Sequence, residues 1–279
     1  MTNNIRTVFF MALLTVLFVW IGGALGGKQG ALIAFIAAAV MNFGGYWFSD
    51  KLVLRRYKAR EAGPEDNSRL YGIVSSLAVN ANLPMPKVYV IPEKTPNAFA
   101  TGRDPKHAAV AATEGIINML DDNELAGVMA HELTHVKNRD ILTSTIAATF
   151  AGAIAMMAQF ARFSGGSSRA RQNPVMLIFI IIGAPLAAIL IKMLVSRIRE
   201  YAADAGGARI SGQPLALANA LNKLHYGVQK HPLTNGNPAH SHMFIINPFF
   251  GGMQKLFATH PPVDERIKRL EAMAKSGPV

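Results

Sequence analysis

Two apolar segments at the start of the chain constrain its fold most strongly. Residues 7–27 contain no charged side chain, and residues 30–48 contain only Asn42 as a strongly polar one. Each segment has about the length that crosses a bilayer as a helix, roughly twenty residues. The "KQG" between them leaves room only for a tight turn, and no A-x-A-type cleavage site precedes the second segment, which disfavours a signal peptide. The pattern predicts a transmembrane helical hairpin over residues 1–50.

The distribution of charge supports a membrane rather than a nucleic-acid partner. The net charge is +11, but the basic residues crowd beside apolar segments instead of forming a binding stripe. Five follow the first pair of segments: Lys51, Arg55, Arg56, Lys58 and Arg60. With Arg6 before the pair and only Lys28 in the turn, the positive-inside rule places both ends of the hairpin in the cytoplasm. The absence of Cys excludes disulfides and thiolate metal ligands.

Residues 61–140 have a soluble composition and clear local signals. The segment "GPEDNSRLYGIVSSLAVNANLPMP" is expected to form a helix that begins near its acidic residues and ends at Asn82, before Pro84. Strands are expected at 87–91 and 107–113, with an extended stretch in "TPNAFATGRD" between them. Asp121 and Glu124 have the spacing of a capping box, which predicts the start of the next helix.

The segment "HELTH" on that helix carries the candidate chemistry. His131 and His135 are four residues apart, so they lie on one helical face and can bind one metal ion. Glu132 lies about 100° around the helix from His131. It points into an apolar arc formed by Leu125, Val128, Met129, Leu133 and Val136. A carboxylate in an apolar environment loses its hydration, which is unfavourable unless the group is paired or takes part in chemistry. Beside a zinc-bound water it can serve as a general base. The alternative is a structural histidine pair on an ordinary helix.

A third metal ligand is needed, because catalytic zinc takes three protein ligands and a water. No His lies six residues beyond His135, as a longer zincin motif would require. The histidine candidates elsewhere are His225, His231, His240, His242 and His260. Glu200 is favoured over them because Asp204 follows it on the same helical face. One of these acids can bind the metal while the other orients a metal-bound His.

Four motifs together resemble the HtpX-type membrane metalloproteases. They are "HELTH", "EYAAD" downstream, "PNAFATG" upstream and "THPPVDERIKRL" near the C-terminus. These enzymes are relatives of the CAAX prenyl endoproteases, within the zincins whose third ligand is a Glu, and the resemblance covers essentially the whole chain. It implies one zinc ion on His131, His135 and Glu200, Glu132 as the catalytic base, and Asp204 beside a metal-bound His.

The resemblance also suggests roles for three further residues. Asn97 lies in the extended stretch beside the active site, where a substrate adds as a further strand, and is a candidate substrate contact. His260 is a candidate donor to the developing oxyanion, or else orders the turn at "THPP". Arg266 is a candidate transition-state contact, or else pairs with a nearby acid.

The predicted fold is a membrane-anchored α+β protein with a mainly helical zincin-like metalloprotease domain, a small mixed sheet and two hydrophobic helical hairpins. The expected divisions are the N-terminal transmembrane hairpin at 1–50, the first part of the cytoplasmic metalloprotease domain at 51–140, a second hydrophobic hairpin at 141–195 and the second part of that domain at 196–279. Three cations, Arg162, Arg169 and Arg171, lie between the apolar segments 141–160 and 174–195. They oppose the positive-inside rule, so the sequence leaves open whether these two segments span the bilayer.

A shared zinc site explains why a catalytic motif stands next to an apolar segment. If His135 and Glu200 hold one ion, residues 141–195 leave and return on the same side of the membrane. With the resemblance, this predicts a multi-pass protease of a bacterial inner membrane, with its site at the cytoplasmic surface. The resemblance implies that its substrates are damaged or misassembled membrane proteins, cleaved in quality control under stress.

Three rival functions are compatible with parts of this pattern. A prenyl-peptide CAAX-type endoprotease is related to the expected class. An intramembrane protease is disfavoured because "DDNE" and "KNRD" flank the motif helix. A non-catalytic zinc-stabilised membrane scaffold would need the three ligands but would have no use for Glu132.

Overall fold

The structure is a computed structural model that describes residues 3–66, 68–140, 197–230 and 261–277. The chain divides into two compact units. One consists of Met1–Ser49 and Thr143–Leu194, and the other of Asp50–Leu142 and Val195–Val279. The predicted second hydrophobic hairpin, 141–195, lies outside the described residues.

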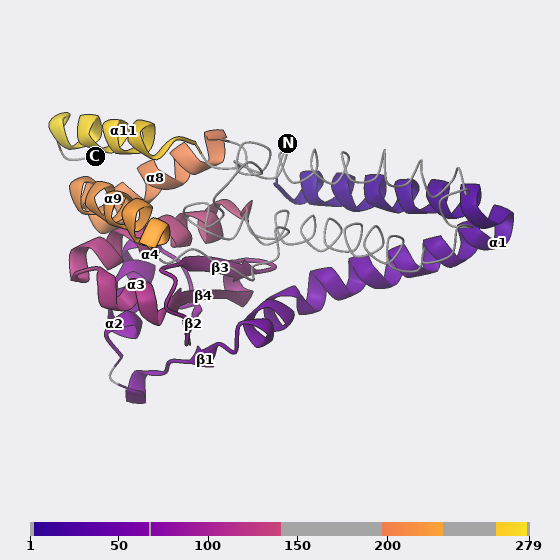
Figure 1. The fold of residues 1–279 in the computed structure, drawn as a ribbon, viewed down its shortest axis with the longest axis horizontal. Coiled ribbons are helices and arrows are strands. Elements are labelled where there is room, and N and C mark those ends of the chain that lie inside the picture. Colours follow the sequence, from indigo (N-terminus) through magenta and orange to yellow (C-terminus); the bar gives the residue numbers. More distant parts are fainter. Residues whose placement is uncertain (1–2, 67, 141–196, 231–260, 278–279) are drawn as a thin grey trace. The chain divides into compact units, whose positions relative to one another are not determined.

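The described part of the first unit is a helical hairpin. Helix α1 (Asn3–Arg56) consists of two antiparallel arms (Figure 1). The chain takes a left-handed conformation at Gly27, with φ 58°, which a residue without Cβ adopts without steric cost. The arms approach so closely near this turn that a Cβ on Gly22 would lie 2.4 Å from the carbonyl oxygen of Gly30. The predicted N-terminal hairpin is therefore present as a helical hairpin.

A polar contact also joins the two arms. The side-chain amide of Asn42 donates to Thr15 Oγ1 at 2.9 Å and to the carbonyl oxygen of Met11 at 3.4 Å. Polar side chains between apolar helices commonly serve as such inter-helix contacts. Within the described residues, only Gly27–Phe48 is long and apolar enough to cross a membrane, whereas the apolar part of the first arm, Met11–Trp20, is shorter. The expected pair of spans is thus seen as one clear candidate span.

The second unit contains a four-stranded mixed sheet. Its strands are β1 (Arg60–Glu61), β2 (Lys87–Ile91), β3 (Ala98–Gly102) and β4 (Ala108–Thr113), in the order β1-β2-β4-β3. β2 and β4 are parallel, and the other neighbours are antiparallel. The strands expected at 87–91 and 107–113 are present. The extended middle of "TPNAFATGRD" is β3, which lies at one edge of the sheet.

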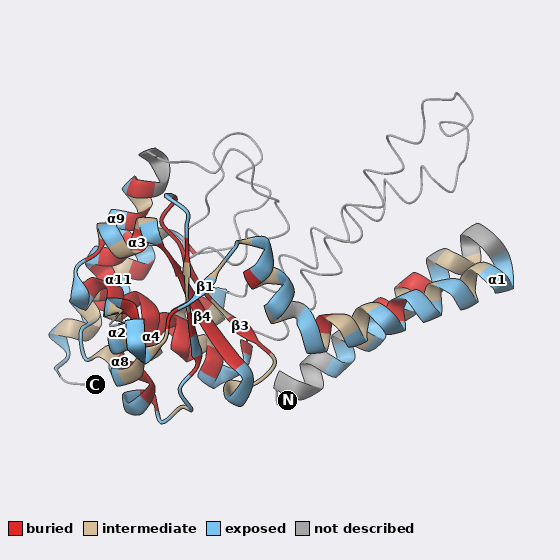
Figure 2. Cartoon of the chain, turned by 90° about the horizontal axis from the view of Figure 1, so that it is seen from below, coloured by how far each residue is buried: buried red, intermediate tan, exposed pale blue. Residues whose placement is uncertain are grey.

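β4 is buried on both faces (Figure 2). On one face, Ala109 and Ala111 pack with Phe99 of β3 and with Leu54 at the end of α1. On the other face, Val110 and Ala112 belong to the large core that the helices build. A strand buried on both faces is continuously apolar rather than alternating, which accounts for the sequence "AAVAA".

Helices cover the second face of the sheet and surround α4. They are α2 (Arg69–Ala81), α3 (Glu114–Met119), α4 (Asp122–Asn138), α8 (Arg197–Ser211), α9 (Pro214–Lys230) and α11 (Val263–Lys275), with single 3₁₀ turns η1 (Pro64–Asp66) and η2 (Pro105–His107). α2 ends at Asn82, which adopts the left-handed conformation (φ 54°) typical of a helix C-terminus. The apolar arc predicted on α4 is wholly buried in the core. α4 is therefore the central helix of this unit.

Candidate metal centre

The start of α4 sets the rotational position of the motif. Asp121 accepts a hydrogen bond from the main-chain N–H of Glu124 at 2.9 Å, and Glu124 accepts one from the N–H of Asp121 at 3.0 Å. This is the capping box that the spacing predicts. Lys223 of α9 pairs with the buried Glu124 carboxylate at 2.6 Å. The helix is thus anchored at its first turn, two turns before the histidines.

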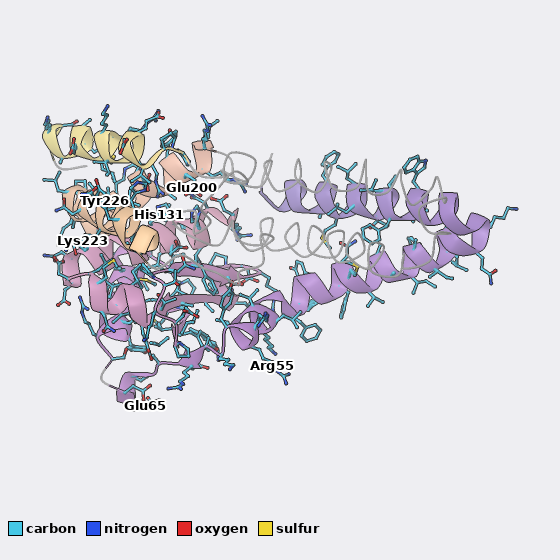
Figure 3. All side chains as sticks on the ribbon, in the orientation of Figure 1. Arg55, Glu65, His131, Glu200, Lys223 and Tyr226 are labelled. Carbon is cyan, nitrogen blue, oxygen red and sulfur yellow. The ribbon has the colours of Figure 1, made fainter. Side chains whose placement is uncertain are left out.

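Three side chains from α4 and α8 converge on one point. The Nε2 atom of His131 lies 3.8 Å from Glu200 Oε2, and the Nε2 atom of His135 lies 3.7 Å from Glu200 Oε1. One ligand atom from each of the three residues lies within 4.8 Å of the other two. His131 and Glu200 are seen side by side in Figure 3. Tetrahedral ligands about 2.0–2.1 Å from a zinc ion are about 3.4 Å apart, so this group needs only a small contraction to hold one.

Close packing between the helices allows this convergence. A Cβ on Gly207 of α8 would lie 2.8 Å from the main-chain nitrogen of His131, closer than real Cβ atoms approach. A Cβ on Gly206 would lie 2.4 Å from a methyl carbon of Thr134. Two successive glycines therefore let the backbone of α8 approach α4 directly beside the first histidine.

Glu132 points toward the sheet edge. Its carboxylate is buried, with 6% of the residue exposed, and accepts a hydrogen bond from the main-chain N–H of Ala100 in β3 at 3.0 Å. Burial raises the pKa of Glu132; the two histidines and the Ala100 N–H oppose this shift, while Glu200 adds to it. A carboxyl group with a raised pKa beside a candidate metal-binding group is suited to accept and return a proton.

A buried ion pair supports His131. Asp204 Oδ1 lies 3.0 Å from His131 Nδ1. The guanidinium of Arg266 donates to both carboxylate oxygens of Asp204, from Nε at 2.8 Å and from Nη2 at 2.7 Å. Burial alone would raise the pKa of Asp204, but Arg266 and His131 lower it to about 2. Asp204 therefore remains ionised and is placed to orient the His131 ring.

His135 also has a carboxylate partner, which the sequence analysis missed. Asp140 Oδ2 lies 3.3 Å from His135 Nδ1. Burial lowers the pKa of His135, but Asp140, Glu200 and Glu132 raise it to about 9. The neighbouring acids thus stabilise positive charge at this point, as they would stabilise a cation. Asp140 gave no periodic signal because it lies beyond the end of α4.

The other predicted site residues are placed as follows. Asn97 is buried, and its main chain pairs with Thr113: the Asn97 N–H donates to Thr113 Oγ1 and its carbonyl accepts the Thr113 N–H, each at 2.9 Å. Arg266 has an acid partner, which was one of the two roles expected for it. Of the alternative third ligands, His225 lies on α9 and is outside the metal-binding group, while His231, His240, His242 and His260 lie outside the described residues.

An H-E-x-x-H pair on one helix, with a Glu carboxylate from a second helix beside both histidines, is the arrangement expected of a metallopeptidase site. The model of peptidase family M48 matches residues 64–274, and the chain belongs to this family. It is therefore a metalloprotease, a hydrolase.

Relatives along the whole chain agree with this assignment. The chain is 55% identical over 280 residues to the "Protease HtpX homolog" of Syntrophotalea carbinolica, covering 97% of this chain and 99% of that protein. It is 52% identical over 282 residues to the homolog of the same name from Burkholderia thailandensis, covering 99% of each. Together with the apolar helix, these relatives support a membrane metalloprotease.

The fold is similar to that in the crystal structure of S. mikatae Ste24p. The TM-score is 0.54 and the sequence identity is 18%. The match covers 96% of this chain but 66% of that chain, so this protein spans just under two thirds of Ste24p. At this level of identity the likeness concerns the fold.

Proposed function

We propose that this protein is a zinc-dependent endopeptidase of the bacterial cytoplasmic membrane, with its active site at the cytoplasmic surface. The observation that carries the proposal is the convergence of His131, His135 and Glu200 next to the buried Glu132. Two imidazoles and one carboxylate form a set of ligands that zinc takes in catalytic sites, with one position left for water. Within the described part of the chain, four buried carboxylates and one buried guanidinium lie around this point, so a divalent cation would offset an excess of negative charge.

The residues of the chain divide the chemistry between them. When bound, zinc supplies a Lewis acid that makes water nucleophilic near neutral pH and polarises a peptide carbonyl. Glu132 takes a proton from the attacking water and returns it to the leaving amine. The Ala100 N–H holds the Glu132 carboxylate in place. Asp204, itself held by Arg266, keeps the proton on His131 Nδ1, so that the Nε2 lone pair would be available to the metal.

The edge strand β3 is the proposed binding surface for substrate. The carbonyl of Asn97 faces β4, and main-chain groups alternate along a strand, so those of Ala98 and Ala100 point away from β4. An extended peptide can pair with such an edge through main-chain hydrogen bonds. Because Ala100 also contacts Glu132, a peptide bound along β3 would lie directly beside the base. Main-chain pairing of this kind suits a protease that cleaves varied, unfolded segments.

The membrane location rests on connectivity and charge. His135 and Glu200 belong to one site, so the apolar segment between them begins and ends on the same side of the membrane. The five cations from Lys51 to Arg60, following the apolar arm, favour the cytoplasm. A multi-pass protein with a site there can cleave exposed parts of damaged or misassembled membrane proteins, which we propose as its substrates in quality control under stress.

The test compares three forms of the detergent-purified protein on an unfolded protein substrate, with bound zinc measured in each. Glu132→Gln should retain about one zinc but lose at least about 100-fold in cleavage rate, the usual contribution of a general base. Glu114→Gln, at an exposed position in the first turn of α3, is the matched control and should cleave like the wild type.

Two other outcomes would favour the rival functions. Zinc bound by all three forms without any cleavage, including of unmodified membrane-protein substrates, would favour the non-catalytic scaffold. Cleavage restricted to a prenylated peptide would favour a CAAX-type endoprotease.

A further inference from the structure

Among the residues that the structure describes, Asp140 is the one buried carboxylate beside His131, His135 and Glu200 that the proposed chemistry does not use. It is 6% exposed, and its Oδ2 atom lies 3.3 Å from His135 Nδ1. The other ring nitrogen of His135, Nε2, faces Glu200 at 3.7 Å. Asp140 and Glu200 therefore lie at opposite nitrogens of one imidazole. We propose that Asp140 is a positioning residue for the metal, which holds the His135 ring through Nδ1 so that Nε2 faces the ion. This inference rests on the proposed metal binding, and it assigns Asp140 no contact with substrate.

The backbone at the end of α4 is shaped to deliver Asp140. Arg139, which closes the helix, has a left-handed conformation (φ 56°, ψ 33°), and its N–H points back to the carbonyls of His135 and Val136. A residue with a Cβ pays about 1–2 kcal/mol to adopt this conformation, and glycine is the usual residue there. The left-handed residue turns the chain back toward the helix axis. The next residue, Asp140, can then reach back to the side chain of His135, about one turn earlier. A helix that continued past Arg139 would carry Asp140 away from that side chain.

The two histidines are supported by different parts of the chain. His131 takes its partner from α8, where Asp204 is held by the fully buried Arg266. His135 takes its partner from its own helix end, five residues later. The His131 side chain is 2% exposed and that of His135 is 17% exposed. Packing therefore restrains the His135 ring less, and a hydrogen bond to Nδ1 has more to contribute to its orientation.

Such a partner has two measurable effects on a metal site. It selects the tautomer with the proton on Nδ1, which leaves the Nε2 lone pair for the ion, and it makes the imidazole a stronger ligand. Loss of an outer partner of this kind usually weakens metal affinity by about 10–100-fold. We expect this range for Asp140→Ala. Asp140→Asn keeps an acceptor oxygen of the same shape but loses the charge, so its affinity should lie between those of the wild type and Asp140→Ala.

The experiment measures zinc dissociation constants by competition with a chelator, with every variant made in the full-length Glu132→Gln protein to prevent self-digestion. Asp104→Ala is the matched control. Asp104 also contacts a histidine Nδ1, that of His107, at 2.9 Å, but His107 is not among the metal-binding residues. Its removal should leave zinc affinity unchanged. The thermal unfolding of each metal-free variant is recorded as well, because a positioning role predicts a change in zinc affinity that a loss of metal-free stability does not explain.

The outcomes separate this inference from the proposed function. Zinc affinity that falls from the Glu132→Gln parent to its Asp140→Asn variant and again to its Asp140→Ala variant supports the positioning role, even if the wild-type enzyme cleaves none of the substrates tried. Equal affinities in all three would overturn it, as would a loss confined to variants whose metal-free form is unfolded. If the parent protein binds no zinc, the proposed function fails and the inference fails with it.

Discussion

Arg266 shows how a single buried residue determines the electrostatics of the site. It is fully buried, and its guanidinium binds both oxygens of Asp204. The planar guanidinium can donate hydrogen bonds to both oxygens of a carboxylate at once, whereas a lysine ammonium is a compact point charge without this geometry. Nearby lie Glu200, whose Oε2 is 4.0 Å from Arg266 Nη2, and the buried Glu132. Without Arg266, the buried carboxylates of Asp204, Glu200 and Glu132 would lose a buried positive charge that offsets their mutual repulsion.

Replacement of Arg266 should therefore destabilise the protein strongly. Removal of one partner of a buried pair leaves an uncompensated charge and typically costs about 3–5 kcal/mol. We expect this loss for Arg266→Met, and a smaller one for Arg266→Lys, which keeps the charge but not the two-point contact. Lys268→Met, at an exposed position on the same helix, is the control and should change little. Denaturant unfolding of the metal-free protein checks this, and equal stability of the two Met variants would contradict it.

At the scale of elements, the crossing of α4 and α8 determines the site. α4 presents the two histidines through its own periodicity, but the distance of Glu200 from them depends on how closely α8 can pack. The glycine pair at 206–207 removes the side chains that would otherwise separate the helices beside His131. The "AADAGG" that follows Glu200 and Tyr201 is therefore part of the candidate metal centre, although its glycines carry no ligand.

Gly207→Ala should weaken both stability and metal binding. The added methyl group would meet the backbone of His131 at 2.8–2.9 Å, and backbone cannot yield as a side chain can, so the helices must move apart. Overpacking of this kind typically costs about 1–3 kcal/mol, and separation of the helices should also lower zinc affinity. Gly72→Ala is the control: it lies on the exposed face of α2 with no atom within 4 Å of the new Cβ. It should stabilise by about 0.5–1 kcal/mol. A Gly207→Ala protein with unchanged affinity and unfolding free energy would refute this.

At the scale of the whole molecule, the metal centre connects two distant parts of the chain. His135 and Glu200 lie on either side of residues 141–195, and the catalytic unit is built from Asp50–Leu142 together with Val195–Val279. Its core contains α2, α4, α8, α9 and α11 as one cluster. A metal ion held by both halves would stabilise their association, because it would bind the folded arrangement and not the separated segments.

Removal of the metal should accordingly lower the thermal stability of the catalytic unit. Ligand bound at 1,000 times its dissociation constant contributes about 4 kcal/mol. A chelator should lower the unfolding temperature of the wild type and of Glu132→Gln alike, and added zinc should restore it. His135→Ala, which lacks a ligand, should unfold at one temperature with or without chelator. A chelator effect of equal size in His135→Ala would show that the ion acts elsewhere.

The features determined by the sequence alone are those set by local periodicity and local hydrogen bonds. The shared face of His131 and His135 follows from their spacing, the start of α4 from Asp121 and Glu124, and the end of α2 from Asn82. Strand β2 and the helical hairpin of α1 were likewise predicted from short-range patterns. In each case the groups concerned lie within a few turns or strand residues of one another, so distant packing has little influence on the outcome.

Only the tertiary structure decided which distant groups meet. The sequence favoured Glu200 as the third ligand over several histidines, and the packing of α8 on α4 is what brings its carboxylate to His131 and His135. It likewise makes β3 an edge strand in contact with Glu132, and pairs Arg266 with Asp204. Asp140 was missed because its position depends on the left-handed backbone at Arg139, for which glycine is the usual signal. Such contacts depend on how whole helices and strands pack around the core, and no spacing between residues in the sequence indicates that packing directly.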